Sequence, residues 1–181
     1  GASRGIGRAT AILAAKAGHA VCVNYVSDKA AADAVVKEIT DAGGKAIAVA
    51  ADTGVEADVI RMFETVDKEL GPITGLVSNA GIHGPRGPVK DLTADASKGA
   101  VNSFSTGLAQ EVVRQGIRVN TVAPGLTETD MTRDGLAKRA PATPLGRAGK
   151  PEEIAQGIMF LLSDEASYIS CANLRVSGGK P

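Results

Sequence analysis

Short apolar runs alternate along this chain with longer segments that have the apolar spacing of amphipathic helices. Helices are predicted at residues 8–17, 28–42, 55–70, 97–114 and 151–162. Asp28 is predicted to cap the second of these helices, and Gly43-Gly44 to end it. Strands are predicted at residues 20–25, 45–50, 75–78, 117–122 and 172–176. Strands that alternate with helices form a parallel sheet, and right-handed crossovers place the helices on both of its faces. We therefore expect an α/β fold with a doubly wound parallel sheet, as a single domain over residues 1–181.

The composition fits a folded domain and argues against two classes of partner. Hydrophobic residues make up 44% of the 181 residues and aromatic residues only 3%, so the core has to be built from Ala, Val, Ile and Leu. The 20 basic and 20 acidic residues cancel without a basic tract, so nucleic acid is not an expected partner. The longest apolar run, at residues 158–162, is too short to span a bilayer, so no membrane partner is expected either.

The cysteines indicate a reducing compartment. Cys22 and Cys171 lie far apart, without the spacing of a metal site or the density of a disulfide-rich protein. The sequence has no secretory signal pattern. We expect a cytoplasmic protein without a bound metal, whose cysteines are small buried apolar residues. Because the chain opens on a glycine-rich turn without an initiating Met, we also expect it to be part of a longer gene product.

Residues 1–7, with the sequence GASRGIG, form a glycine-rich turn that runs into the first predicted helix. Gly1 allows a tight turn, Gly5 lets the backbone approach a pyrophosphate, and Gly7 lets the helix pack closely on the sheet. The helix N-terminus adds free N–H groups and a positive dipole end. The turn therefore predicts a dinucleotide site in a Rossmann-type sheet. The alternative is a purely structural turn before a helix.

Further motifs follow the turn in a fixed order. They are Asp52-Thr53, Ser78-Asn79-Ala80-Gly81, Ser97-Lys98, Pro124-Gly125 and the sequence VSGG at residues 176–179. Together with the turn, they resemble the short-chain dehydrogenase/reductase family over essentially the whole chain, and most of all its 3-oxoacyl-carrier-protein reductase and glucose 1-dehydrogenase type. The resemblance implies an NAD(P)-dependent oxidoreductase that interconverts a carbonyl and an alcohol of a small molecule by hydride transfer.

The end of the first predicted strand favours NADP(H) over NAD(H) as the cofactor. In dinucleotide folds that use NAD, an acidic residue about 20 positions after the glycine turn holds the ribose 2′-hydroxyl. Here Asn24, Tyr25 and Ser27 stand at the strand end, without a carboxylate that would repel a 2′-phosphate. Arg4 can give such a phosphate a charge-assisted hydrogen bond, and Asn24 and Ser27 can add neutral donors. NAD(H) remains the alternative cofactor, and a solvated cation is the alternative role of Arg4.

The resemblance assigns further residues to the cofactor. Asp52 and the backbone of Thr53 would bind the adenine edge, and the alternative for Asp52 is an N-cap of the next helix. Residues 79–81 would pass close to the adenosine ribose. The Thr127 backbone and the Thr129 hydroxyl would bind the nicotinamide carboxamide, with an ordinary turn as the alternative. The expected cofactor-binding residues are Gly1, Ser3, Arg4, Gly5, Ile6, Gly7, Asn24, Tyr25, Ser27, Asp52, Thr53, Asn79, Ala80, Gly81, Lys98, Pro124, Gly125, Thr127 and Thr129.

The catalytic residues that the resemblance implies are incomplete in this chain. The family uses a Tyr four residues before a Lys, together with a Ser that orients the carbonyl. Lys98 matches the lysine, which would lower the pKa of the tyrosine and bind the nicotinamide ribose. The alternative for Lys98 is a solvated helix lysine. Ala94 stands where the tyrosine belongs, and no residue matches the serine.

We interpret these gaps as missing segments. A helix–strand–loop unit is expected between Asp95 and Ala96, and a first strand before Gly1, so that the catalytic Tyr and Ser lie outside the 181 residues. The alternative is a non-catalytic homologue that binds the dinucleotide as a sensor or scaffold.

The sequence also predicts an active-site lid, and by resemblance it implies contacts between subunits. Residues 127–144 form a long segment without periodicity, which predicts an active-site lid. Its basic residues Arg133, Lys138 and Arg139 would either meet an acidic substrate or form a solvated charge cluster. By resemblance, the helix at 97–114 and the strand at 172–176 form contacts between subunits, which implies a homotetramer or, as the next choice, a homodimer.

Overall fold

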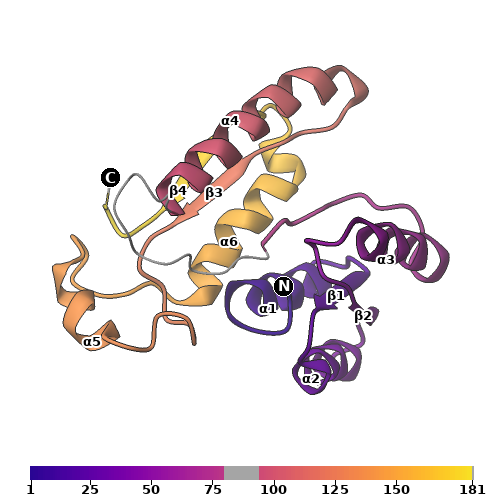
Figure 1. Ribbon diagram of the computed structural model, residues 1–181, viewed down its shortest axis with the longest axis horizontal. Coiled ribbons are helices and arrows are strands. Elements are labelled where there is room, and N and C mark those ends of the chain that lie inside the picture. Colours follow the sequence, from indigo (N-terminus) through magenta and orange to yellow (C-terminus); the bar gives the residue numbers. More distant parts are fainter. Residues whose placement is uncertain (80–93, 181) are drawn as a thin grey trace. The chain divides into compact units, whose positions relative to one another are not determined.

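The computed structural model describes residues 1–79 and 94–180, except for the side chains of residues 94–101. The chain divides into two compact units, Gly1–Gly81 and Ile82–Pro181. Each unit combines a pair of parallel strands with helices that pack on it (Figure 1). This is the α/β, Rossmann-type pattern that the alternation of strands and helices predicts.

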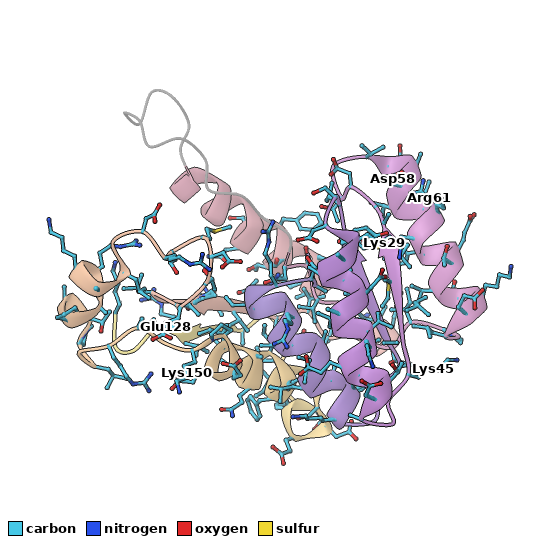
Figure 2. The ribbon with its side chains drawn as sticks, turned by 90° about the horizontal axis from the view of Figure 1, so that it is seen from below. Lys29, Lys45, Asp58, Arg61, Glu128 and Lys150 are labelled. Carbon is cyan, nitrogen blue, oxygen red and sulfur yellow. The ribbon has the colours of Figure 1, made fainter. Side chains whose placement is uncertain are left out.

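The first unit contains, in chain order, α1 (Gly5–Lys16), β1 (Val21–Tyr25), α2 (Lys29–Asp41), β2 (Ala46–Ala50) and α3 (Glu56–Glu69). β1 and β2 are parallel and in register from Val21 opposite Ala46 to Tyr25 opposite Ala50. In Figures 1 and 2 the strands lie between α3 on one side and α1 and α2 on the other. This unit therefore has helices on both faces of its strand pair.

The core of the first unit is built from small and branched aliphatic side chains, as the low aromatic content predicts. Val23 at the centre of β1 is fully buried and belongs to one cluster with Ala11 of α1 and with Val35 and Ile39 of α2. Such a core excludes water from the strand pair and leaves the polar groups to gather at the strand ends.

The ends of α2 confirm the predicted caps. Asp28 accepts a hydrogen bond from the Ala31 N–H at 3.0 Å. After the helix, the chain turns through Gly43, whose φ is 84°, and Gly44 donates its N–H to the carbonyl of Ile39. α1 differs from the prediction, because it begins at Gly5 rather than at residue 8. The second half of the glycine turn is thus already helical.

The prediction of a strand at residues 75–78 is wrong for the part of the chain that the structure describes, because no strand forms there. This segment belongs to no strand pair there, and Leu76 is 64% exposed and Val77 37% exposed. A strand needs neighbours that bind its backbone N–H and C=O groups. β1 and β2 pair with each other, and the segment at 75–78 pairs with neither of them within the described residues.

The second unit contains α4 (Ala94–Val112), β3 (Thr121–Pro124), the short α5 (Leu136–Arg139), α6 (Pro151–Leu162) and β4 (Asn173–Val176). Short 3₁₀ turns lie at Val113–Gln115, Ala140–Ala142 and Asp164–Ala166. β3 and β4 are parallel, with Thr121 opposite Asn173, and α6 packs against both. The predicted helix at 151–162 is confirmed, with Pro151 in its first turn.

β3 begins later than the strand predicted at 117–122. Before β3, the side chain of Asn120 makes hydrogen bonds to backbone groups that a neighbouring strand would otherwise bind. Asn120 accepts a hydrogen bond from the Ala172 N–H and donates one to the Ile169 carbonyl, both at 2.9 Å. The backbone of Val119 still accepts from Cys171 at 2.8 Å. The segment is therefore held beside the chain that leads into β4 without being a regular strand.

Arg118 closes the C-terminal end of α6. Its Nη1 donates to the carbonyls of Leu161 (2.6 Å) and Ile169 (3.3 Å), and its Nη2 donates to the carbonyl of Ser163 (3.1 Å). The last carbonyls of a helix have no donor within the helix itself. One guanidinium group thus supplies donors at the helix end and joins α6 to the segment before β4.

Among the helices that the structure describes, none has the length and hydropathy needed to cross a membrane. Over the same part of the chain, no three His, Cys, Asp or Glu side chains are grouped so that they could hold a metal ion.

Candidate functional site

The glycine turn folds back on itself in front of α1. Gly5 has a φ of 56°, in the left-handed region that favours glycine. A Cβ on Gly7 would lie 2.0 Å from the Gly1 carbonyl oxygen, so only glycine fits at that position. Arg4 is the N-cap residue of α1, and no side chain caps the helix there. The first N–H groups of α1 are therefore available to a ligand at the positive end of the helix dipole.

Two asparagines hold this turn against the strand ends. Asn24 in β1 accepts a hydrogen bond from the Gly1 nitrogen (2.6 Å) and donates one to the carbonyl of Ala51, just after β2 (2.9 Å). The backbone carbonyl of Asn24 accepts from the Ala2 N–H at 2.8 Å. Asn79 donates from Nδ2 to the Gly1 carbonyl at 2.8 Å. The structure thus brings together the turn, the ends of β1 and β2, and Asn79.

These contacts differ in part from the roles that the sequence predicts. Asn24 is expected to offer a donor to a phosphate, but its carboxamide already holds the turn and the end of β2. Gly7 is expected to bring the helix close to the sheet, but it faces the Gly1 carbonyl and the Asn79 amide instead. The other predicted residues of this unit lie in the same turn, at the end of β1 or in the segments after β1 and β2, except for Ala80 and Gly81, which are outside the described residues. Those that the structure describes are Ser3, Ile6, Tyr25, Ser27 and Thr53.

Asp52 lies in an exposed turn after β2. Its Oδ1 accepts a hydrogen bond from the Gly54 N–H, and its own N–H donates to Oδ2 of Asp58, both at 2.9 Å. The N-cap residue of α3 is Val55, so the alternative role of Asp52 as the helix N-cap is wrong. Two hydrogen bonds lower the pKa of the Asp58 carboxyl: the one from the Asp52 N–H has the larger effect, and the one from the Arg61 guanidinium the smaller. Figure 2 labels Asp58 and Arg61. Asp58 thus anchors the backbone of Asp52 and leaves the Asp52 carboxylate at the surface.

The segment after β1 offers no uncommitted carboxylate to a ligand. Tyr25 and Ser27 follow Asn24, and the carboxylate of the next residue, Asp28, caps α2. Arg4 is exposed, and none of the ion pairs within the described residues includes it.

The predicted loop after β3 is firmly held in the second unit. Gly125 follows Pro124, the last residue of β3, and donates its N–H to the Val176 carbonyl at 3.0 Å. A Cβ on Gly125 would lie 2.6 Å from the Ser177 backbone. Thr127 is only 3% exposed, and its hydroxyl donates to the Gly125 carbonyl at 3.1 Å. The loop is thus fixed against β4 by close backbone contacts.

Thr132 lies at the centre of this loop, although no motif in the sequence predicts a role for it. Its hydroxyl donates to the Thr127 carbonyl, lies 3.0 Å from the Thr129 nitrogen and lies 3.1 Å from the Thr129 hydroxyl oxygen. Hydroxyl groups three residues apart in a loop were the only signal in the sequence that could have indicated it.

The predicted lid at residues 127–144 has structure of its own, including α5. Arg139 donates to the carbonyls of Thr132 (2.9 Å), Asp134 (3.0 Å) and Gly135 (3.3 Å). Arg133 forms an ion pair with Asp130 at the surface. Of the basic residues that the sequence groups together, Arg139 therefore serves the fold of the lid itself.

Lys98 lies on α4, and its side chain is outside the described residues. α4 runs from Ala94 to Val112 without interruption, so the junction where a missing unit is predicted lies inside one helix. Tyr25 belongs to β1, and Tyr168 is fully exposed after α6. Within the described residues, neither tyrosine stands in the family position before Lys98.

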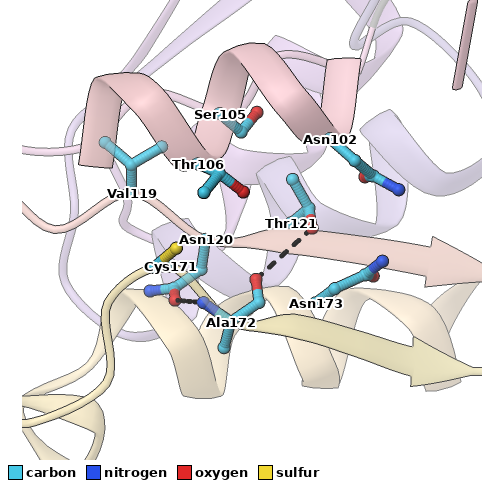
Figure 3. A pocket seen from close by; sticks show the side chains of 9 residues that line it. All are labelled: Asn102, Ser105, Thr106, Val119, Asn120, Thr121, Cys171, Ala172 and Asn173. Carbon is cyan, nitrogen blue, oxygen red and sulfur yellow. Dashed lines mark hydrogen bonds between the residues drawn. The ribbon is translucent and has the colours of Figure 1, made fainter. Parts of the chain in front are cut away.

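A pocket lies between α4 and the segments around β3 and β4 (Figure 3). It is lined by Asn102, Ser105, Thr106, Val119, Asn120, Thr121, Cys171, Ala172 and Asn173. None of these is a predicted cofactor residue. Cys171, which the sequence predicts to be buried, is exposed and has a φ of 67°.

Known proteins resemble the chain over almost all of its length. A family model described as short chain dehydrogenase matches residues 1–96, and one described as Enoyl-(Acyl carrier protein) reductase matches residues 93–180. An uncharacterized oxidoreductase of Escherichia coli is 35% identical, over 99% of this chain and 97% of that protein. A 3-oxoacyl-[acyl-carrier-protein] reductase of Synechocystis is 34% identical, over 99% and 94%. The crystal structure of a short chain dehydrogenase from Burkholderia cenocepacia in complex with NADP is 28% identical, with a TM-score of 0.87 over 99% and 94% of the two chains.

The alignment with the E. coli protein is longer than this chain. It extends over 240 residues, whereas the chain has 181, so part of the relative has no counterpart here. The two family models meet at residues 93–96, beside the junction between Asp95 and Ala96.

Proposed function

Because the chain belongs to the short-chain dehydrogenase family, a family of oxidoreductases, we propose that it is an NADP(H)-dependent enzyme that interconverts a carbonyl and an alcohol of a small molecule. The observation that carries this proposal is the glycine turn, which Asn24 and Asn79 hold in front of the uncapped N-terminus of α1. Such a helix N-terminus is a ready site for the pyrophosphate of a dinucleotide.

Arg4 is the residue that supports NADP(H) over NAD(H). It stands exposed at the N-cap of α1, and the Asp28 carboxylate is committed to α2. Arg4→Ala is expected to weaken NADPH binding by about 1.5–3 kcal/mol and NADH binding much less. Fluorescence titration with both cofactors measures this. Arg8→Ala is the matched control, because Arg8 is engaged with Glu38. Tighter binding of NADH than of NADPH to the wild type would overturn the preference.

The other cofactor contacts are part of the same proposal. Asp52 and Thr53 would hold the adenine edge, and residues 79–81 the adenosine ribose. The nicotinamide carboxamide would lie at the loop after β3, where Gly125 and Thr127 are held most closely. The proposed contacts there come from Pro124, Gly125, Thr127 and Thr129.

In the proposed reaction, the bound nicotinamide supplies or accepts the hydride, and a tyrosine donates or accepts the proton on the substrate oxygen. Lys98 is the catalytic residue that lowers the pKa of that tyrosine and contacts the ribose. Lys98→Ala is expected to lose most of the rate of ketone reduction and to bind NADPH less tightly. Wild-type turnover and affinity in this variant would contradict the assignment.

We place the tyrosine and the serine in a helix–strand–loop unit between Asp95 and Ala96, and a further strand before Gly1. Two observations support these missing segments: the segment at 75–78 stands without strand neighbours in the described residues, and the relative aligns over 240 residues. The intact mass of the purified natural protein tests the proposal. A mass well above 18.3 kDa is expected, and a mass equal to it would reject the missing segments.

The alternative function is a dinucleotide-binding sensor or scaffold without turnover. It is favoured by one observation, that Ala94 stands four residues before Lys98 where the family has its tyrosine. Consumption of NADPH with a reactive ketone, followed at its nicotinamide absorbance, separates the two. Tight NADPH binding without consumption would favour the sensor.

We propose a homotetramer, or a homodimer, in the cytoplasm. α4 supports a contact between subunits, because Phe104 is 69% exposed and a Cβ on Gly107 would meet nothing within 4 Å. Both cysteines are free thiols, which supports a reducing compartment. Burial raises the pKa of the Cys22 thiol to about 11. Light scattering that gives the mass of one subunit at micromolar concentration would contradict the assembly.

A further inference from the structure

The hydroxyl of Thr132 has all of its hydrogen-bonding capacity engaged inside the loop after β3. It donates to the Thr127 carbonyl, and the Thr129 carbonyl lies 3.2 Å away as a second acceptor. The Thr129 nitrogen lies 3.0 Å from it and the Thr129 hydroxyl oxygen 3.1 Å. Thr129 and Thr132 are half-buried and Thr127 is buried. The Thr132 hydroxyl therefore has all of its hydrogen-bond partners on Thr127 and Thr129.

The direction of each hydrogen bond follows from the capacity of a hydroxyl, which has one proton to donate and two lone pairs to accept with. The proton of Thr132 goes to a backbone carbonyl, because a carbonyl can only accept. One lone pair accepts from the Thr129 N–H. The other lone pair is then left for the Thr129 hydroxyl, so Thr129 is the donor in the contact between the two hydroxyls.

The Thr129 oxygen therefore has its own proton engaged with Thr132 and only lone pairs left for a ligand. We propose that Thr132 is a positioning residue that makes Thr129 a hydrogen-bond acceptor for the –NH₂ of the nicotinamide carboxamide. This inference rests on the proposed function, which places the carboxamide at Thr129. An acceptor-only hydroxyl at this position disfavours a phosphate or carbonyl oxygen, because neither has a proton to offer.

The backbone holds Thr132 in place independently of its hydroxyl. The Thr132 N–H donates to the Thr129 carbonyl at 3.1 Å, and Arg139 donates to the Thr132 carbonyl at 2.9 Å. Thr132→Val replaces the hydroxyl by a methyl group, so it is expected to keep the loop and to release the proton of Thr129. Thr132→Ser keeps the hydroxyl and is the conservative variant that should retain the wild-type behaviour.

The test compares NADP⁺ with 3-acetylpyridine adenine dinucleotide phosphate, in which a methyl group replaces the carboxamide –NH₂. Isothermal titration calorimetry measures both dissociation constants. The wild type is expected to bind NADP⁺ about fivefold more tightly than the analogue, the effect of one hydrogen bond. In Thr132→Val the ratio of the two dissociation constants, analogue to NADP⁺, is expected to fall to about one. The reason is that a Thr129 hydroxyl that rotates freely can also donate to the acetyl oxygen. Thr132→Ser is expected to keep the wild-type ratio.

Thr143→Val is the matched control, because it removes a hydroxyl that serves the Ala140 and Arg147 carbonyls in the same unit. Its ratio is expected to equal that of the wild type. A wild-type ratio in Thr132→Val, or its loss in Thr132→Ser, would overturn the inference. If Thr132→Val does not fold, Thr132→Ala removes the same hydroxyl with a smaller side chain, and this variant has to lose the preference for NADP⁺ as well. Failure of the wild type to bind either dinucleotide would count against the proposed function instead.

Discussion

Gly7 is the residue of the glycine turn at which a side chain is least tolerable. A Cβ there would lie 2.0 Å from the Gly1 carbonyl oxygen and 2.8 Å from Nδ2 of Asn79. The first of these atoms belongs to the backbone, so relief requires the whole turn to move. Gly7→Ala is expected to weaken NADPH binding by about tenfold or more, in line with an overpacking cost of about 1–3 kcal/mol. Fluorescence titration checks the affinity.

Gly107→Ala is the control for this substitution. Gly107 lies within α4, and a Cβ there would meet nothing within 4 Å. NADPH affinity is expected to be unchanged, because Gly107 lies in the second unit and outside the glycine turn. Wild-type affinity in Gly7→Ala would show that the turn does not form the dinucleotide site.

The residues that the sequence predicts correctly are those whose partners are close in the chain. Asp28 caps α2 through Ala31, three residues away, so its role is visible in a short window. Asn24 and Asn79 act through Gly1, which is 23 and 78 residues away, and their contacts exist only once the strands are placed. Thr132 is a local case that was still missed, because its role depends on the direction of hydroxyl protons and not on residue type.

At the scale of elements, Arg118 fixes the end of α6. Arg118→Ala is expected to lower the free energy of unfolding by about 1.5–3 kcal/mol, because the carbonyls of Leu161, Ser163 and Ile169 lose a charged donor. Arg118→Lys keeps the charge but not the planar fork, so an intermediate loss is expected. Urea unfolding of the three proteins tests this. Equal stability of Arg118→Ala and the wild type would contradict the clamp.

The N-terminus of α6 has a pH-dependent contact. Glu153 binds Arg147 through two hydrogen bonds of 2.7 Å and accepts from the Lys150 N–H at 2.7 Å, and these partners lower its pKa to about 2. A folded-state pKa below the unfolded value stabilises the protein above the ordinary carboxyl pKa, and this contribution is lost as the pH falls towards 2. Wild type is therefore expected to be more stable than Glu153→Gln at pH 7, and the difference is expected to vanish near pH 2.

Urea unfolding at pH 7, 4 and 2 measures this difference. Glu152→Gln is the matched control, because Glu152 lies in the same first turn but in no ion pair of the described residues. Its stability relative to wild type is expected to change little with pH. Salt is expected to reduce the Glu153 effect, because the pair is exposed. A Glu153→Gln difference that persists unchanged at pH 2 would rule out the ion pair as its cause.

All of the predicted helices are found in the structure, whereas one predicted strand is absent from the described residues and another is displaced. α6 forms the hydrogen bonds between its own turns without a neighbouring element, and its observed bounds, Pro151–Leu162, are the predicted ones. The segment at 75–78 has the apolar pattern of a strand, but a strand depends on neighbours that this chain does not provide within the described residues. β3 is displaced for a related reason, because the side chain of Asn120 occupies backbone groups that a longer strand would use.

At the scale of the molecule, the proposed missing segments would also explain why the segment at 73–79 is exposed. A doubly wound sheet joins its two halves at the first and fourth strands, and the fifth strand flanks the fourth on its other side. The segment at 75–78 would be the fourth strand, and it is unpaired in the described residues. Its exposed Leu76 and Val77 are the apolar surface that two flanking strands would cover. The missing catalytic tyrosine and serine and the missing sheet neighbours would thus come from the same segments.

Amide hydrogen exchange tests this explanation directly. In the 181-residue chain, residues 73–79 are expected to exchange rapidly, because they are exposed and belong to no strand pair there. In the purified natural protein they are expected to exchange as slowly as β1, since strands on both sides would bind their N–H groups. β1 is the internal reference because it is paired with β2 in either case. Rapid exchange of residues 73–79 in the natural protein would mean that no strands flank them. The proposed source of the catalytic tyrosine would then be lost, and the sensor or scaffold would be the function that remains.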